Sequence, residues 1–373
     1  MKRSATLMLA AVICLLLTVP ASRTFAAEVS VQLQNPPASG TVVLTLYNSA
    51  NTFGDLRDPA RTEAFSLDGR DRYVLTDVPP GEYALLVYYD ENDNREIDKS
   101  FIGIPTEPLG FSNNYTPKGP PSYTRAAFTL TSDEQRTFTV DLYRPLGKSG
   151  RLGVGIGAIS RSSPYRDYDG GVTQVIPAIT YTGDRLQILG PNISYGLVGS
   201  GKVRLAAAGA YRPGVYDEDD SDYLKGMGDR DSTFTAGLAL QVELPQGFDL
   251  SLGYQHDVLD RIGGGEARVA VDKSFQLGAF RLSPQLGINW LSQDLADYDF
   301  GVPQDKATAD RPAYRVDSTV TFDAGVGVLY EINADWLVVM NVAVEFFADE
   351  ITDSPIVEDD YVLKGFVAVN YVF

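Results

Sequence analysis

The chain has 373 residues, with 49 acidic and 31 basic side chains and a formal net charge of −18. A chain this acidic lacks the basic face that nucleic-acid partners need, so we expect none. It contains 35 Gly, 21 Tyr and 17 Phe residues and no long stretch of helical periodicity, which favours an all-β protein.

The first 26 residues have the three parts of a secretory signal peptide. Two basic residues precede an apolar stretch at 7–19, and Thr24-Phe25-Ala26 places small residues before a cleavage site. We predict cleavage after Ala26. The chain's one cysteine, Cys14, lies in this segment, so the mature protein would have neither a disulfide nor thiol chemistry.

Residues 27–145 contain short β-rich runs separated by Pro, Gly and Asn clusters. TVVLTLYN (41–48) and EYALLVYYD (82–90) are examples. This pattern is typical of a small sandwich, and we expect a periplasmic β-sandwich domain here. The Gly-rich segment 146–150 predicts a linker to whatever follows.

One loop of this domain, DENDNREID (90–98), has the spacing of a calcium site. Asp90, Asn92 and Asn94 place oxygen donors at alternate positions, as at the start of an EF-hand loop, and Asp98 follows them. The glycine and the bidentate glutamate of such a loop are missing. These four residues are candidate Ca²⁺ ligands, but on such a partial match we prefer an Asx-rich turn bonded to its own backbone.

From residue 151 onward, runs of about ten residues alternate strictly between apolar and other side chains. In 336–346, every second residue from Trp336 to Phe346 is apolar, whereas Asn341 and Glu345 lie on the opposite face. A period of two with one apolar face predicts strands. Aromatic residues end the apolar faces and charges occupy the others, which indicates an antiparallel transmembrane β-barrel at 151–373 rather than a secreted sandwich.

Short turns alternate with longer, mostly acidic loops, as they do in outer-membrane barrels. We predict strands near 151–160, 173–182, 203–215, 233–244, 248–257, 266–276, 280–292, 315–332, 336–348 and 361–373. Gly190-Pro191 could divide the remaining segment 185–198 into two short strands, giving about twelve in total. An irregular crossing there would give ten. We prefer twelve.

The inward-facing positions of these strands carry charges of both signs. Such charges can pair and fill a narrow lumen, whereas a selective pore would be lined by one sign. The positions are Arg204, Arg212, Arg268, Arg281 and Lys364, together with Glu243, Asp249, Asp272, Asp317, Asp323, Glu331 and Glu345.

His256 is the one histidine of the chain. A barrel hydrolase would need a serine or an acid beside it, but Asp257 points to the opposite face of the strand. We therefore expect no enzyme activity. The acidic loops, such as 216–223, could bind divalent cations shared with lipopolysaccharide or could form a solvated surface.

Three stretches resemble the MipA/OmpV family of outer-membrane proteins, which includes the MltA-interacting protein: 181–197, 229–240 and 348–360. The resemblance implies a barrel without catalytic residues, and for the named member a scaffold that joins a lytic transglycosylase to a murein synthase. Residues 79–114 resemble a different group, an uncharacterised family of exported Ig-like or transthyretin-like β domains. The resemblance to outer-membrane proteins also implies that Phe373, at the end of the closing strand, belongs to the signal read by the insertion machinery.

Together these patterns predict an outer-membrane protein with a periplasmic β domain. We expect a non-enzymatic scaffold; a small channel is the alternative, and a barrel lipid hydrolase is a third. The expected partners are outer-membrane lipid and lipopolysaccharide, the insertion machinery, and a periplasmic murein hydrolase or synthase.

Overall fold

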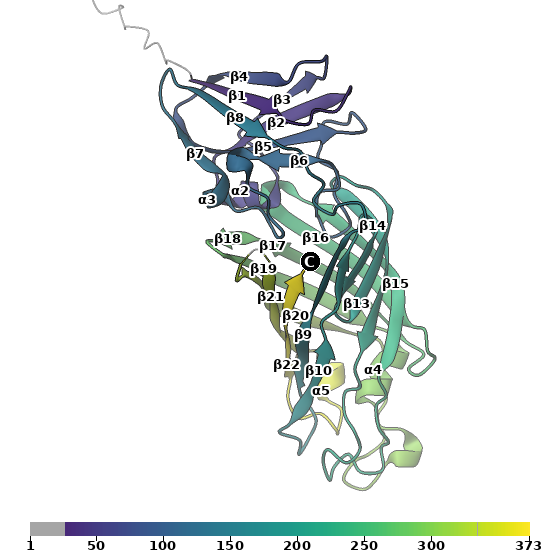
Figure 1. The fold of residues 1–373 in the computed structure, drawn as a ribbon. Coiled ribbons are helices and arrows are strands. Elements are labelled where there is room, and N and C mark those ends of the chain that lie inside the picture. Colours follow the sequence, from purple (N-terminus) through teal and green to yellow (C-terminus); the bar gives the residue numbers. More distant parts are fainter. Residues whose placement is uncertain (1–26, 334) are drawn as a thin grey trace, which may run out of the picture.

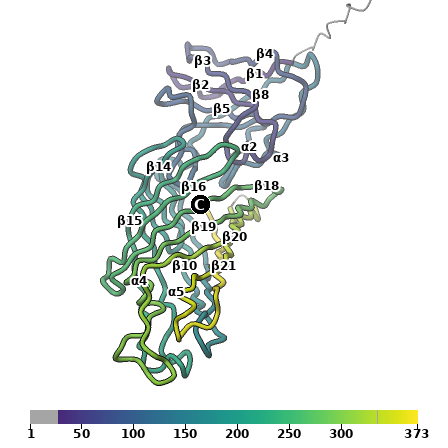
Figure 2. The backbone as a smooth tube through the Cα atoms, turned by 180° about the vertical axis from the view of Figure 1, so that it is seen from behind, coloured from purple at the N-terminus to yellow at the C-terminus, as the bar shows by residue number. Residues whose placement is uncertain are grey.

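The computed structural model describes residues 27–333 and 335–373. The predicted signal peptide, with Cys14 and the cleavage after Ala26, lies outside the described residues. Two sheets formed by residues 27–140 stack on one end of a barrel formed by residues 151–372 (Figure 1). The view from behind shows the same arrangement, with α4 and α5 at the far end of the barrel (Figure 2). Among the described residues, no helix has both the length and the apolar character needed to cross a membrane.

The N-terminal residues form a small sandwich of two sheets. One sheet has the order β4-β1-β8, and the other has the order β3-β2-β5-β6, with β7 also paired to β5. The strands are β1 (Ala27–Leu33), β2 (Thr41–Tyr47), β3 (Arg61–Ser66), β4 (Arg72–Val78), β5 (Gly81–Asp90), β6 (Leu109–Phe111), β7 (Ala127–Leu130) and β8 (Gln135–Val140). Short helices connect them: α2 (Ala50–Asp55), η1 (Ser112–Asn114) and α3 (Tyr123–Ala126).

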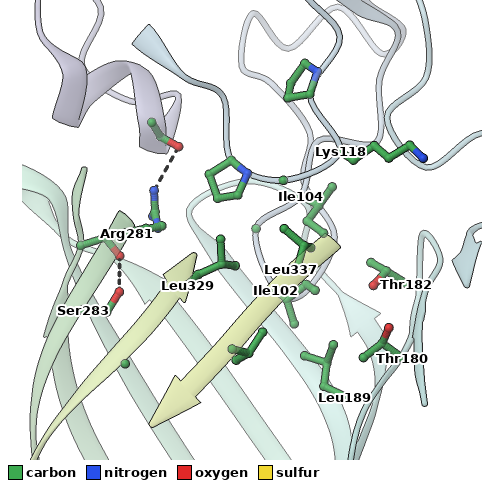
Figure 3. Close-up of a pocket in the computed structure, with 18 of the residues that line it drawn as sticks. Ile102, Ile104, Lys118, Thr180, Thr182, Leu189, Arg281, Ser283, Leu329 and Leu337 are labelled. Atoms are coloured by element: carbon green, nitrogen blue, oxygen red, sulfur yellow. Dashed lines mark hydrogen bonds between the residues drawn. The ribbon is translucent and has the colours of Figure 1, made fainter. Parts of the chain in front are cut away.

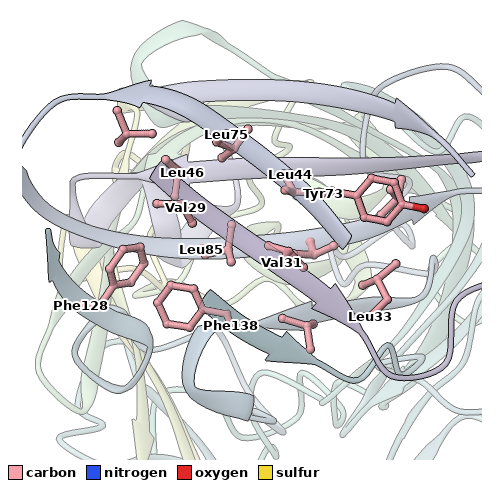
Figure 4. Packing of buried hydrophobic residues seen from close by; sticks show 14 of the residues in the cluster. Val29, Val31, Leu33, Leu44, Leu46, Tyr73, Leu75, Leu85, Phe128 and Phe138 are labelled. Atoms are coloured by element: carbon pink, nitrogen blue, oxygen red, sulfur yellow. The ribbon is translucent and has the colours of Figure 1, made fainter. Parts of the chain in front are cut away.

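Strand β2 is buried on both of its faces, and this explains why five of its seven residues are apolar. Leu44 and Leu46 pack into the core between the two sheets, together with Val29 and Phe138 (Figure 4). The other face of the strand joins a second cluster around Phe53 of α2. Helix α2 also contacts β18 of the barrel, so this second cluster lies between the sandwich and the barrel.

The barrel is one antiparallel sheet that closes where β22 pairs with β9. β10 and β11 both pair with β9 and act as one interrupted strand, as do β17 and β18 against β19, so twelve strands form the wall. They are β9 (Arg151–Ser162), β10 (Gly171–Pro177), β11 (Thr180–Thr182), β12 (Leu186–Leu189), β13 (Asn192–Val198), β14 (Val203–Arg212), β15 (Thr233–Glu243), β16 (Phe248–Asp257), β17 (Gly265–Lys273), β18 (Phe275–Leu277), β19 (Phe280–Leu291), β20 (Thr319–Glu331), β21 (Trp336–Phe347) and β22 (Tyr361–Val372).

The prediction of an all-β protein with a twelve-strand barrel is confirmed, including the division of 185–198 into two short strands. The last strand, predicted at 361–373, has the same alternation, since Leu363 and Val367 are exposed and Asn370 is buried. One inward position was wrong: β20 begins at Thr319, so Asp317 lies in the preceding loop and is exposed. The boundaries proposed at residues 145 and 150 stay predictions.

The loops at the long-loop end of the barrel pack around an apolar cluster of their own. It includes Tyr165, Tyr216 and Phe300, all 2 % exposed or less. Two helices of this region, α4 (Gln293–Phe300) and α5 (Asp349–Thr352), contribute to it, and Ser292 caps α4 by accepting a bond from the Leu295 N–H. A short 3-10 helix, η3 (Gln304–Lys306), also lies in these loops. The loops therefore cover this end of the lumen, whereas the sequence suggested only cation-binding or solvated acidic loops.

Candidate functional site at the domain–barrel junction

The sandwich is fixed to the short-turn end of the barrel by a buried group of charges around Glu243. This residue ends β15 with its side chain on the inner face of the barrel. It pairs with Arg204 of β14 (2.6 Å from Nη1), with Arg57 (2.9 Å from Nε) and with Lys99 (3.2 Å from Nζ). The four side chains are only 3–15 % exposed. Two of the three cations come from the sandwich, so one barrel carboxylate joins the two parts of the chain.

A second barrel carboxylate, Asp249 of β16, shares Arg57. Arg57 Nη2 donates to both Asp249 oxygens, at 2.8 and 3.0 Å. Burial alone would lower the pKa of Arg57, but the hydrogen bond to Asp249 and the charges of Asp249, Glu243 and Asp55 together outweigh it and raise that pKa. Burial lowers the pKa of Lys99, with the charge of Glu243 opposing the shift. The lysine therefore depends on its carboxylate partner to stay charged.

Further contacts surround the rim. Arg281 of β19 pairs with Asp55 at the end of α2. On another sector, Lys118 reaches Asp335 at 2.5 Å and donates to the Val372 carbonyl at 3.2 Å. Elsewhere the Lys99 backbone N–H donates to the Ser200 carbonyl at 2.7 Å. Because these contacts lie on different strands, the sandwich is fixed in orientation as well as in position.

The charges deeper in the barrel pair with one another. Arg268 binds Asp323 through two N–H groups, the Nη2–Oδ1 distance being 2.8 Å. Lys364 pairs with Glu345 at 2.6 Å, and Asn289 donates to both carboxylates, at 3.1 and 3.4 Å. The predicted pairing of inward charges is therefore confirmed for these residues, and the network lies inside the barrel with Arg268 35 % and Lys364 47 % exposed.

Two of the predicted lumen arginines have partners outside the barrel wall. Arg212 pairs with Asp299 of α4, and Arg281 pairs with Asp55 of the sandwich. Arg57, Lys99 and Lys118 lie outside any pattern that predicts such contacts. Alternation identifies which barrel residues face inward, but it carries no information about which residues of another domain meet them.

A cavity of about 610 Å³ lies between the sandwich and the lumen network (Figure 3). Ile102 and Ile104 of the sandwich face Leu189, Leu329 and Leu337 of the barrel across it. Polar groups at its edge include the paired cations described above. A mostly apolar cavity of this size is in the range of small-molecule sites.

The predicted calcium residues lie together in one loop but bind one another and the backbone. The Asp90 carboxylate, 2 % exposed, accepts from the backbone N–H groups at 94 and 95 (3.1 and 2.7 Å). The side-chain amides of Asn92 and Asn94 donate to Asp98 at 2.8 and 3.0 Å. Within residues 27–333 and 335–373, no group of three or more His, Cys, Asp or Glu side chains converges as metal ligands.

Glu107 supports this loop from outside it. Its two oxygens accept from the N–H groups of Glu91 and Asp98, at 2.8 and 3.1 Å. Burial raises the pKa of Glu107 to about 7, against the opposing effect of these two bonds. The Asx-rich turn accounts for every contact described here, and calcium binding by the loop stays a prediction.

Calcium should raise the melting temperature of the sandwich in the full-length protein if the loop binds the ion, because a ligand that binds only the folded state stabilises it by mass action. Asp90→Ala combined with Asp98→Ala should abolish the shift, while Asp68→Ala, at an exposed pair with Arg70, should retain it. The measurement is a thermal scan with and without millimolar calcium. An unchanged melting temperature in the unmodified protein would leave the loop as a turn.

Phe373 follows β22 and lies on the outer surface. It is 63 % exposed, its N–H donates to the Leu152 carbonyl at 3.0 Å, and its ring packs edge-to-face against Tyr371 with 5.0 Å between centroids. These contacts join the last strand to the first and leave the ring free on the lipid side. The role of Phe373 in insertion stays a prediction.

Deletion of Phe373 should leave unfolded, protease-sensitive chain when the protein is overexpressed, because the closing strand would lose both a backbone bond to β9 and the terminal aromatic ring. The measurement is heat-modifiable gel migration, with Phe248→Leu as a control at another exposed aromatic residue. Normal migration of the deletion variant would refute the role.

His256 lies on the outer face of β16 and stacks on Tyr254, whose hydroxyl is 3.2 Å from Nδ1. Asp257, next in sequence, is buried and binds the loop that follows, accepting from Thr233 Oγ1 and from the N–H groups of Ile262 and Gly263. The aspartate therefore does not face the histidine. The contact that the structure shows at His256 is the aromatic one with Tyr254.

The closed barrel, with apolar residues outside and paired charges inside, defines an outer-membrane β-barrel protein. Residues 154–373 match the family described as MltA-interacting protein MipA, and the chain belongs to this family. Residues 31–138 match a family described as an uncharacterized protein conserved in bacteria. Both resemblances found in the sequence are thus confirmed.

Curated relatives show how far the similarity extends. Outer membrane protein Omp26La of Vibrio anguillarum is 34 % identical over 144 residues, which cover 39 % of this chain and only 56 % of that protein. The putative outer membrane protein YiaT of Escherichia coli K12 is 27 % identical over 228 residues, covering 60 % of this chain and 92 % of its own length. The MltA-interacting protein of the same strain is 27 % identical over 225 residues, with 60 % and 89 % covered.

Among solved structures, the COG4313 outer membrane channel of Pseudomonas putida F1 covers 60 % of this chain and 95 % of its own, at 10 % identity and a TM-score of 0.34. The N-terminal barrel domain of Pseudomonas aeruginosa OprF covers 59 % and 97 %, at 10 % identity and a TM-score of 0.23. Scores this low support no comparison of function.

Proposed function

We propose that the protein is a non-enzymatic scaffold of the outer membrane, in which residues 27–145 face the periplasm and hold cell-wall machinery beside the membrane. The observation that carries the proposal is the buried charge group around Glu243, which fixes the sandwich in one orientation on the short-turn end of the barrel. A domain held this way presents a constant surface to a partner. Short turns face the periplasm in barrels of this class.

The partner class follows from a relative. A protein that is 27 % identical to this chain is named for its interaction with MltA, and we propose a murein hydrolase or synthase as the partner here. The two Escherichia coli K12 relatives are covered to 89–92 % of their length by 60 % of this chain. The sandwich therefore adds a binding surface that the matched part of these relatives does not account for.

Ion conduction through the barrel is the competing function, and the side chains inside the barrel argue against it. The apolar loop cluster covers one end, the sandwich covers the other, and the pairs of Arg268 and Lys364 lie between them. We expect little or no steady conductance in planar bilayers, both for the mature protein and for the chain without residues 27–145. A stable, ion-selective current from either would replace the scaffold with a channel.

Site-directed photo-crosslinking in cells tests the partner. A crosslinking residue at Arg70 on the sandwich should form adducts with a murein hydrolase or synthase, detected by mass spectrometry. The same residue at Lys225 in the long loops is the matched control, because both side chains are 61 % exposed. Crosslinking residues at Glu63 and Arg136 sample two more surface positions of the sandwich. Adducts with a murein enzyme from Lys225, and from none of the three sandwich positions, would contradict the proposal.

A further inference from the structure

The barrel wall is incomplete at one place. A strand needs about 9–11 residues to cross the hydrocarbon layer of an outer membrane, but β12 has 4 residues and β13 has 7. Their turn at Gly190-Pro191 therefore lies partway along β9, but it is level with Tyr211, one residue before the end of β14. Beyond this turn, β10 pairs with β9 on one side, and in the described parts of the chain no strand pairs with its other side.

The backbone bonds at the turn show which way each residue of β10 points. The Ala178 N–H donates to the Gly155 carbonyl of β9 at 3.1 Å, whereas the Ile179 carbonyl accepts from the Gly190 N–H at 3.2 Å. Successive residues of a strand direct their backbone polar groups to opposite sides. The odd-numbered residues of β10 therefore direct theirs away from β9, toward the gap in the wall.

Three of these residues are Thr173, Val175 and Pro177. Proline has no backbone N–H, and its position here is typical of an open edge. Strand edges facing lipid do not occur within the hydrocarbon region, where an open backbone is tolerated only if it is buried in protein or lines a cavity. The open edge of β10 thus indicates a passage through the wall.

The gap is bordered by apolar side chains on its outer side. Val175 is 69 % exposed, Ile179 is 50 % exposed and Ile193 is 39 % exposed. A side-chain hydrogen bond spans it, in which the Tyr211 hydroxyl of β14 lies 3.4 Å from Gln174 Oε1 of β10. At this length the hydrogen bond is weak. The passage therefore faces the bilayer, and the hydrogen bond described across it is weak.

The cavity described above reaches the inner side of this gap. Ala178, Leu189 and Gly190, at the tip of the short hairpin, all line it. Asn370 also lines it and is 3 % exposed, and its Oδ1 accepts no hydrogen bond from any described group. A buried amide oxygen without a donor costs free energy unless a ligand supplies one.

We propose that this cavity binds the acyl chain of a membrane amphiphile, which enters from the bilayer between β10 and β14. The loop cluster and the sandwich lie over the two ends of the barrel, and the side passage offers a hydrocarbon chain a route that avoids them. The hydrocarbon chain lies against Leu189, Leu329 and Leu337. An O–H or N–H group of the amphiphile's headgroup donates to Asn370 Oδ1.

Quenching by brominated lipid tests the site in the mature full-length protein. Trp290 and Trp336 both face outward and are replaced by phenylalanine; a single tryptophan is then placed in the cavity by Leu337→Trp. In vesicles of phosphatidylethanolamine brominated on its acyl chains, whose ammonium group can donate to Asn370, the fluorescence should fall at least twofold relative to the unbrominated lipid. Met340→Trp, on the outer face of the same strand, should be quenched in any case, and Phe300→Trp in the loop cluster should not.

Separate experiments identify the source of the acyl chain and its route into the cavity. Quenching by brominated phospholipid identifies a bilayer lipid, and quenching only after addition of a brominated fatty acid identifies a free acid; both support the site. Ala178→Phe should abolish the quenching of Leu337→Trp by filling the inner side of the passage, and Leu189→Phe replaces it if gel migration shows that the first variant is unfolded. Quenching of Leu337→Trp by aqueous acrylamide but by neither brominated probe would overturn the site, and unchanged quenching in a folded blocked variant would overturn the route.

Discussion

Replacing Glu243 with alanine is expected to release the sandwich from the barrel while the barrel stays folded. The change leaves Arg57, Lys99 and Arg204 buried around a lost carboxylate, with Asp249 near only one of them. Removing one partner of a buried ion pair costs about 3–5 kcal/mol. At about 1.4 kcal/mol for each factor of ten, the undocked population should rise on the order of a hundredfold or more.

Limited trypsin digestion measures the release, because Arg57 and Lys99 are buried at the junction in the docked form. New cleavage after these two residues, with unchanged heat-modifiable migration of the barrel, is the expected result. Glu63→Ala is the control: its pair with Arg61 is 30–39 % exposed, and surface pairs of this kind contribute about 0–1 kcal/mol. An unaltered digestion pattern in Glu243→Ala would show that the other rim contacts hold the sandwich without this group.

The sequence was most informative where lipid constrains it. Every strand of the wall needs one apolar face, and this requirement produced the alternation from Trp336 to Phe346 and along the last strand. Gly190-Pro191 also marked the short hairpin correctly. The pattern stops at the membrane surface, and this is why the start of β20 was placed too early and Asp317 was assigned to the lumen.

The candidate site could be predicted only in part, for a physical reason. Glu243 and Asp249 were identified as inward charges from their strand positions, but their partners Arg57 and Lys99 lie in loops of another domain, where no periodicity fixes the direction of a side chain. The loop cluster escaped prediction in the same way. Its apolar residues, such as Tyr165 and Phe300, are isolated among acidic residues and become neighbours only in the folded barrel.

A second large effect on stability is expected in the charge network inside the barrel, which consists of Arg268, Asp323, Lys364, Glu345 and Asn289. Arg268→Met should lower the free energy of unfolding of the barrel by about 3–5 kcal/mol, because Asp323, whose side chain is 6 % exposed, then keeps only the amide of Asn289 and the surrounding dipoles. The double variant Arg268→Met/Asp323→Leu should recover most of this loss. Arg268 is 35 % exposed and Asp323 is buried, and apolar replacement of both leaves no desolvated charge, which is often neutral or stabilising.

The fraction of folded, heat-modifiable protein as a function of urea concentration measures all three proteins. Lys225→Met is the control, because its pair with Asp222 is 61–91 % exposed and its loss should change the midpoint little. We expect the urea midpoint of the double variant to lie closer to that of the unmodified protein than the midpoint of the single variant does. If both variants are equally destabilised, Arg268 stabilises the barrel through the packing of its side chain and not through its charge pair with Asp323.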